Sequence, residues 1–258
     1  MQLNNIVHLE SYPIDDSTFT DQCKQQLDTT GALVLNGFLT SKAIEKIVTE
    51  GVDNQHLAFY STSSHNVYLR ESDPSFPADH VRNLLVNSSK GCITDDQIPE
   101  DSPLRMLYDS SLFRTFLAKI FGEQQLHNYA DKLSSINLHY ASEDQELGWH
   151  FDESSFAITL LLQPPQAGGN FEYVENMRDA DKGEMNFAGV ADVLSGKTAV
   201  KALQAQAGTL SLFRGRNAMH RVTPTQGDTT RMLVVLAYNS QPDVALSESA
   251  RMTFYGRM

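Results

Sequence analysis

Cysteine is scarce in this chain, and the two that occur, Cys23 and Cys92, lie far apart without a Cys-X-X-Cys pair. This spacing excludes a zinc knot or a disulfide framework as the main source of stability, because both need clustered cysteines. A reducing compartment is therefore expected, and the cytoplasm fits best. The N-terminal stretch Met1–Asp16 lacks the basic start and apolar centre of a secretory signal peptide.

Basic residues are also in short supply, with 20 Lys and Arg against 32 Asp and Glu and a formal net charge of −12. No cluster of Lys and Arg is visible, so a nucleic-acid-binding surface is excluded. The acidity would favour a cationic substrate, although an acidic composition more often serves solubility. No apolar run approaches the length that spans a bilayer, so no membrane partner is expected.

The length of 258 residues fits a single all-β barrel with added helices. We expect residues 1–258 to form one domain. In it, 1–130 would supply helical support and a lid segment, 131–240 a jelly-roll core, and 241–258 a C-terminal extension. The sequence leaves the oligomeric state open between a monomer and a homodimer.

The first half of the chain predicts two helices and a long irregular segment. Lys42–Glu50 has helical character and is expected to stop at Gly51. Pro103–Phe121 carries apolar residues at helical spacing and predicts a second helix. Between them, Tyr60–Pro99 is rich in Ser, Asn, Asp and Pro, and loops of that length are usually functional, for example as a lid.

From Asp131 onward, short apolar stretches separated by Gly, Pro and Asn predict strands. The predicted strands are Leu133–Tyr140, Trp149–Asp152, Phe156–Gln163, Asn170–Val174, Thr209–Phe213, Ala218–Val222 and Met232–Tyr238. Met177–Gly196 interrupts them as a polar insertion. This pattern predicts a mainly β fold with flanking helices, a double-stranded β-helix (jelly roll, cupin-like) with the N-terminal helices packed on one face.

The triplet His150-Phe151-Asp152 is the strongest chemical signal in the sequence. Alternate side chains of a strand share a face, so His150 and Asp152 would project together. His220 can join them if the chain folds back. Two imidazoles and one carboxylate hold a ferrous ion on one face and leave positions for a co-substrate and oxygen. The triplet alone is equally compatible with surface residues on an edge strand.

Arg231 opens the last strongly apolar strand, shortly after His220. A guanidinium binds a carboxylate bidentately and stays charged when buried, as the distal carboxylate of a diacid co-substrate requires. The apolar run Met232–Leu236 suggests that Arg231 enters an interior, where an unpaired charge would be costly. The alternative is a salt bridge with a carboxylate of the protein itself.

Four segments together resemble the iron(II)/2-oxoglutarate-dependent dioxygenase superfamily: HFD at 150–152, GGNFEYV at 168–174, GTLSLF at 208–213 and MHRVTPTQGDTTR at 219–231. This resemblance covers roughly Asp131–Ser240. More loosely, 65–82 and 251–256 resemble the branch that holds the radical amino-acid halogenases and the free-lysine hydroxylases.

The resemblance implies specific roles for these residues. His150, Asp152 and His220 would ligate iron(II), and Arg231 would hold the C5 carboxylate of 2-oxoglutarate. Oxygen would be the second co-substrate, with release of succinate and CO2, and ascorbate would stimulate turnover. Halogenases of the branch have a small residue in place of Asp152, which frees a position for chloride, so the carboxylate here implies hydroxylation.

Several further side chains are candidates for binding, each with an ordinary structural alternative. In the strand before the triplet, either Asn137 with His139 or Leu138 with Tyr140 would line the cavity, and we carry Asn137 and Tyr140 as candidates for 2-oxoglutarate contacts. Glu153 could pair with a substrate amine or be a solvated carboxylate. The remaining substrate-binding candidates are Arg70, His80, Arg82 and Trp149. The alternative is an ordinary surface charge for the first three and packing next to the site for Trp149.

The leading prediction is therefore an oxygenase that hydroxylates an unactivated C–H bond of a small molecule. A free amino acid, lysine-like or otherwise cationic, or a small amine metabolite is the expected substrate. One alternative is a prolyl-type protein or peptide hydroxylase, which would need an open groove at the metal. The other is a non-catalytic cupin-like protein that binds or senses a metal.

Overall fold

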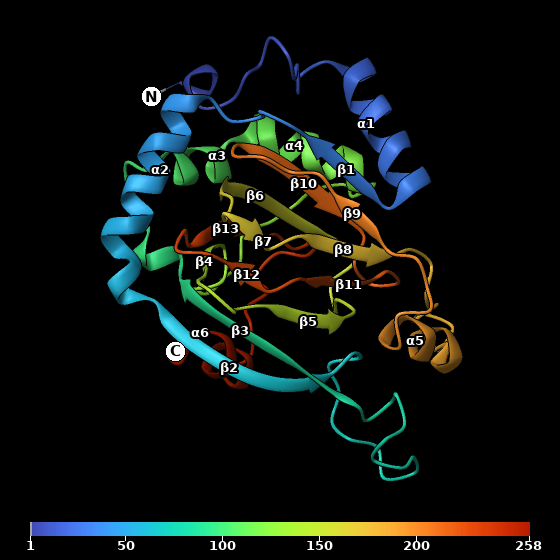
Figure 1. Cartoon of the computed structure of the whole chain (residues 1–258). Helices are drawn as coiled ribbons and strands as arrows, with labels where there is room; N and C mark the ends of the chain where they lie inside the picture. The colour runs from blue at the N-terminus through green and yellow to red at the C-terminus, as the bar shows by residue number, and fades with distance from the viewer. Residues whose placement is uncertain (1) are drawn as a thin grey trace.

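The computed structural model describes residues 2–258, and its centre is one antiparallel sheet that curls into a nearly closed barrel (Figure 1). The strands are β1 Ala32–Leu35, β2 Phe59–Asn66, β3 Leu85–Ile93, β4 Ile136–Ala141, β5 Leu147–His150, β6 Ala157–Gln163, β7 Ala167–Gly168, β8 Phe171–Val174, β9 Lys201–Leu203, β10 Thr209–Phe213, β11 Met219–Val222, β12 Thr225–Gln226 and β13 Arg231–Leu236. The main sheet runs β1-β10-β6-β13-β4-β3-β5-β11-β8-β9, β2 pairs with β3, and β12 pairs with β7 in a separate ribbon. The predicted jelly-roll architecture is confirmed.

The helices around this barrel are α1 Ser17–Thr30, α2 Ser41–Asn54, α3 Pro103–Asp109, α4 Ser111–Phe121, α5 Phe187–Leu194 and α6 Glu248–Tyr255, with short 3-10 turns at Leu3–Asn5, Gln55–Leu57 and Asp95–Gln97. Helices α1 to α4 cover one outer side of this barrel, whereas α5 and α6 lie elsewhere (Figure 1). The first four pack against β1, β10, β6, β13 and β4 in one large apolar core (Figure 1), as predicted for the N-terminal helices. None of these helices combines the length and apolar character that crossing a membrane requires.

Side-chain alternation in β4 and β13 divides this core from the inside of the barrel. On β13, Met232 and Val234 face the helices, whereas Arg231 lies on the opposite face of the strand. On β4, Tyr140 faces the helices and His139 faces inward. The barrel interior therefore receives the polar residues of both strands.

The prediction that the first helix stops at Gly51 is wrong, because α2 continues to Asn54. Gly51 lies buried against the sheet, where a Cβ would come within 2.2 Å of Cε of Met232. Its carbonyl accepts a hydrogen bond of 2.6 Å from the Tyr140 hydroxyl. This glycine thus permits close helix–sheet packing and does not terminate the helix.

The single helix predicted over Pro103–Phe121 is two helices, α3 and α4. Ser110 separates them in an extended conformation (φ −62°, ψ 117°), and its side chain accepts a hydrogen bond from the amide of Phe113. Serine is a favoured N-cap, so the break starts a new helix without leaving the first amides unpaired.

The segment Tyr60–Pro99 is more regular than predicted. Residues 60–66 and 85–93 belong to the β2–β3 hairpin, and the longest irregular part is 67–84. The strands were missed because β2 is exposed on both faces and has no apolar alternation. Helix α5 likewise lies within the predicted polar insertion, and α1 and α6 had no predicted counterpart.

Candidate metal centre

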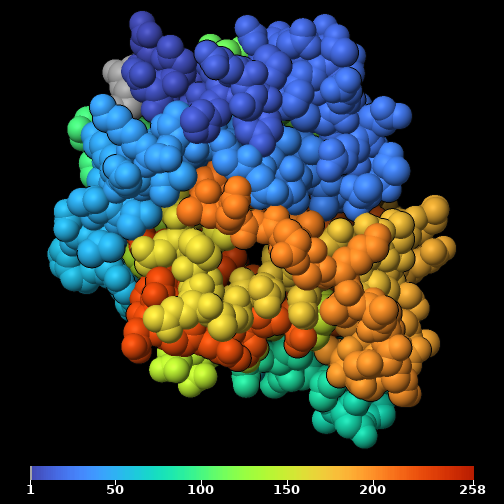
Figure 2. Space-filling model, turned by 45° about the horizontal axis from the view of Figure 1, so that its top comes forward, coloured from blue at the N-terminus to red at the C-terminus, as the bar shows by residue number. Residues whose placement is uncertain are grey.

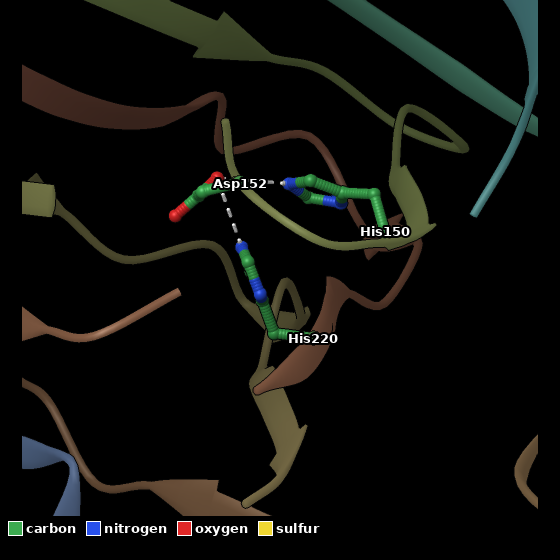
Figure 3. A group of neighbouring side chains, drawn as sticks. All are labelled: His150, Asp152 and His220. Carbon is green, nitrogen blue, oxygen red and sulfur yellow. Dashed lines mark ion pairs between the residues drawn. The ribbon is translucent and has the colours of Figure 1, made fainter. Parts of the chain in front are cut away.

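Three side chains from two strands and one turn converge at one end of the barrel (Figure 3). His150 ends β5 and pairs directly with His220 on β11. The predicted strand stops there, and Asp152 lies in the following turn, where its amide donates to the Gly215 carbonyl at 3.1 Å. One ligand atom of each of the three side chains lies within 4.8 Å of the others, so the predicted triad is brought together.

Local hydrogen bonds orient both imidazoles. Nδ1 of His150 lies 2.8 Å from the carbonyl of Gly148, and Nδ1 of His220 lies 2.9 Å from the carbonyl of Ala218. Because a carbonyl oxygen only accepts, each Nδ1 carries the proton and each Nε2 keeps its lone pair. Metal-binding histidines are typically oriented in this way.

Asp152 directs its carboxylate at these lone pairs. Its Oδ1 lies 3.4 Å from Nε2 of His220 and 3.7 Å from Nε2 of His150. Its Oδ2 is buried and has no hydrogen-bond partner among the described residues. Three acceptor groups facing one point fit a bound cation, and this donor set with one open side is typical of non-haem iron(II).

The pKa values agree with such a site. Burial, with a smaller contribution from His220, lowers the pKa of His150 to about 3, so its imidazole is neutral. Burial acts to raise the pKa of Asp152, but the two imidazoles and Arg178 outweigh it, so the carboxyl is ionised. The uncompensated charge of the triad is therefore negative, as a site for a divalent cation requires.

Aromatic side chains form the wall beside the triad. The ring of Phe171 stacks on His220 with centroids 5.4 Å apart, and Phe213 meets it edge-on at 5.0 Å. His65 approaches His150 edge-on at 6.2 Å and holds Ser88 by a 2.7 Å hydrogen bond. Such a shell limits the access of water to a metal.

Two supporting residues had not been predicted. Gly215 packs so closely on Asp152 that any side chain there would collide with the carboxylate. Arg178 donates to the Asp152 carbonyl at 3.4 Å and lies over the Phe151 ring at 4.2 Å. Gly215 stands in an Arg-Gly-Arg turn and Arg178 in the polar insertion, and neither position has a sequence signal that would mark it.

Arg231 projects into the barrel interior with only 9% of its surface exposed. Burial lowers the pKa of its guanidinium to about 10, and its Nε has no partner among the described residues. No carboxylate of residues 2–258 pairs with it, so the protein salt bridge considered as an alternative is not formed. Gly169 covers Arg231, since a Cβ there would lie 2.9 Å from Cδ of the arginine.

The other two proposed co-substrate contacts, Asn137 and Tyr140, have partners within the protein. The amide of Asn137 donates to the carbonyls of Leu133 and Ile136 and accepts from the Tyr255 hydroxyl. Tyr140 lies on the helix-facing side of β4, with its hydroxyl bonded to α2. We therefore leave both out of the site.

The substrate-binding candidates fall into two groups. Glu153 follows the triad and forms a 3.1 Å ion pair with Arg70, both side chains being more than half exposed. Arg82 lies 6.0 Å over the ring of Tyr68, near this pair, and its Nη1 is buried without a partner.

His80 and Trp149 belong to packing arrangements away from the triad. The ring of His80 stacks on Phe76 at 4.5 Å and meets Phe187 of α5. Trp149 is buried in a small apolar cluster on the side of β5 opposite His150, with Arg221 4.8 Å over its ring. The structure therefore pairs Glu153 with Arg70, and it places His80 and Trp149 in packing arrangements apart from the triad.

The surface near the barrel is hollowed. Figure 2 shows a hollow between the yellow chain around β7 and the orange chain that precedes β10. A separate cavity of about 330 Å³ is lined by Ser155, Arg214, Arg216 and Asn217, which adjoin the turns that hold Asp152 and Gly215. None of the three triad side chains lines this cavity.

The jelly-roll barrel and the His-Asp-His triad are typical of the iron(II)/2-oxoglutarate-dependent oxygenase superfamily. The model of the family described as Halogenase D matches residues 15–254, and the chain belongs to that family. A search of curated proteins gave no match.

Solved structures share the fold at low sequence identity. A 2OG-Fe(II) oxygenase family oxidoreductase from Burkholderia pseudomallei has a TM-score of 0.54 and 13% identity, over 87% of this chain and 92% of that one. The 2-oxoglutarate-dependent carbocyclase SnoK of nogalamycin biosynthesis has a TM-score of 0.59 and 12% identity, over 84% and 82%. A prolyl hydroxylase from Trichoplax adhaerens has a TM-score of 0.53 and 15% identity, over 86% and 90%.

Proposed function

We propose that this protein hydroxylates an unactivated C–H bond of a free amino acid or a small amine metabolite, with 2-oxoglutarate and oxygen as co-substrates. The observation that carries the proposal is the carboxylate of Asp152 aimed at the free Nε2 atoms of His150 and His220. When bound there, iron(II) supplies the oxygen activation that is coupled to decarboxylation of 2-oxoglutarate to succinate. The protein holds the reactants and limits the access of water.

Asp152 favours hydroxylation over halogenation. In the halogenating members of this branch, the corresponding residue is small and leaves a position for chloride. Here the carboxylate fills that position, and Gly215 provides the space for it. We therefore assign oxygen insertion, although the family takes its name from halogenases.

Arg231 supplies the anchor for 2-oxoglutarate in this proposal. Its guanidinium is buried in the barrel without a carboxylate partner, and a buried unpaired cation is costly unless an anion joins it. The distal carboxylate of the co-substrate would satisfy the guanidinium bidentately.

The Arg70–Glu153 pair supports a zwitterionic substrate. Glu153 directly follows Asp152 in the chain, and both side chains of the pair are exposed enough to exchange partners. An amino acid could place its ammonium group on Glu153 and its carboxylate on Arg70, replacing one ion pair by two. Such an exchange would cost little, because exposed ion pairs contribute little stability.

A substrate screen tests the proposal. Iron, ascorbate and 2-oxoglutarate are supplied with each free amino acid, and succinate release is measured with the product mass. The expected result is stimulated succinate and a product heavier by one oxygen atom. If prolyl peptides stimulate turnover and free amino acids do not, the substrate assignment is wrong. Absence of bound iron and of succinate would instead indicate a non-catalytic cupin-like protein.

Asp152→Ala tests the ligand assignment in the same assay. Hydroxylation should collapse, whereas the matched variant Asp15→Ala, at an exposed aspartate remote in sequence from the triad, should keep full activity. Undiminished hydroxylation by Asp152→Ala would show that the carboxylate is not a ligand.

A further inference from the structure

A second cation, Lys90, lies inside the barrel near Arg231. Resting on the proposed function, we infer that Lys90 and Arg231 together bind the distal carboxylate of the 2-oxo acid. Lys90 would then be a further binding residue that makes a distal carboxylate a requirement for the co-substrate. No sequence pattern pointed to this residue, which lies on β3, within the segment expected to be irregular.

The sheet register places the two cations on either side of one strand. Arg231 of β13 is paired with Ala141 of β4. On the other side of β4, Gly91 is paired with Tyr140, so Lys90 comes level with Ala141. Residues opposite each other in a sheet share a face. Both side chains therefore enter the barrel at the same level, from the two strands that flank β4.

His139 contacts Lys90. The Nζ of Lys90 lies 3.2 Å from Nε2 and 3.3 Å from Nδ1 of His139. Burial lowers the pKa of His139 well below its ordinary value, and the charges of Lys90 and Arg231 lower it further, so the imidazole is neutral. A neutral ring accepts one hydrogen bond from Lys90 and does not compensate its charge.

No carboxylate among residues 2–258 lies within ion-pair distance of Lys90 or Arg231. Burial also lowers the pKa of Lys90, as expected for an ammonium group removed from water without a counter-ion. Two cations that converge without an anion disfavour the ligand-free state and favour a bound carboxylate. The distal carboxylate of 2-oxoglutarate would supply the compensating charge, and pyruvate has no such group.

Binding measurements test this inference without turnover. The protein is loaded with Mn(II) in place of iron, and dissociation constants for 2-oxoglutarate and for pyruvate are obtained from thermal-unfolding shifts. Lys90→Met should raise the dissociation constant for 2-oxoglutarate by about tenfold or more, because one charge-assisted hydrogen bond is lost. Binding of pyruvate should stay unchanged. Lys42→Met, at an exposed lysine at the start of α2, is the matched control and should change neither.

The ligand-free variant gives a second readout. Lys90→Met should be at least as stable as the unaltered protein, since it removes a buried charge that has no counter-ion. Lys90→Arg keeps the charge and should retain 2-oxoglutarate binding better than Lys90→Met, which keeps the inference testable if the methionine variant fails to fold.

Two outcomes would overturn the inference. One is unchanged 2-oxoglutarate binding by Lys90→Met, and the other is an equal loss for 2-oxoglutarate and pyruvate, which would indicate a structural role. Failure of the proposed function looks different, because the unaltered protein itself would then show no stabilisation by 2-oxoglutarate.

Discussion

Gly215 lies so close to Asp152 that a Cβ on the glycine would come within 1.8 Å of Oδ2 of the carboxylate. The same glycine accepts a hydrogen bond from the Asp152 amide through its carbonyl. It thus holds the backbone of Asp152 and leaves room for its side chain. The position of the carboxylate depends on the absence of a side chain at residue 215.

Gly215→Ala should weaken metal binding by about tenfold to 100-fold, the usual effect of disturbing a group that orients a ligand. The added methyl group would push the Asp152 carboxylate away from His150 and His220. Iron or Mn(II) titration measures the change. Gly91→Ala is the matched control, because the nearest atoms there belong to the exposed ring of Tyr60, which can move. Equal metal affinity in both variants would contradict this account.

Gly169→Ala should raise the KM for 2-oxoglutarate while metal affinity stays the same. Gly169 has a φ of +60°, and a Cβ would lie 2.9 Å from Cδ of Arg231, so alanine both strains the turn and displaces the guanidinium. Steady-state succinate release at varied 2-oxoglutarate gives the KM, and metal titration provides the control. An unchanged KM would show that the turn at Gly169 does not contribute to binding of 2-oxoglutarate.

His139→Gln should make the free energy of unfolding fall less steeply as the pH drops below 6.5. The unfolded chain takes up a proton on His139 below its ordinary pKa of 6.5, whereas the folded protein keeps the ring neutral. The free energy of unfolding therefore falls as the pH drops below 6.5, by up to about 1.4 kcal/mol per pH unit for this one group. Denaturant unfolding of metal-free protein and variant between about pH 7.5 and about pH 5.5 measures it. If the free energies of unfolding of the two proteins fall equally with decreasing pH, His139 is not a buried neutral ring.

Glu153→Gln should raise the KM for an amine-bearing substrate and leave substrate-free turnover of 2-oxoglutarate unchanged. The substitution removes the negative charge proposed to meet the ammonium group, but does not touch the metal ligands. Loss of the exposed pair with Arg70 should change the stability by less than about 1 kcal/mol. If the KM for the substrate does not move, the amine binds elsewhere.

The sequence predicted the parts of the protein that follow local rules. The core strands are short apolar stretches separated by Gly, Pro and Asn, and strands form at these places in the structure, so the jelly roll was predictable. His150, Asp152 and His220 were recognised because their order and spacing follow a known pattern, although Asp152 is held by a turn and not by the strand.

The remaining features depend on tertiary contacts that leave no local trace. Gly51 resembles a helix stop in sequence, and only the neighbouring sheet explains why it sits inside α2. The polar strand β2 has no hydrophobic period and forms because β3 offers it a full hydrogen-bonding edge. Lys90 reads as an ordinary charged residue until the register of β3 and β4 places it beside His139.

Each histidine of the triad is oriented by a carbonyl two residues earlier in the chain, and neither of these hydrogen bonds involves Asp152. The third ligand can therefore change while the other two stay in place. An aspartate codon becomes a glycine or an alanine codon by one base change. A single point mutation at residue 152 can thus remove the carboxylate without rebuilding the barrel or releasing either imidazole from its carbonyl.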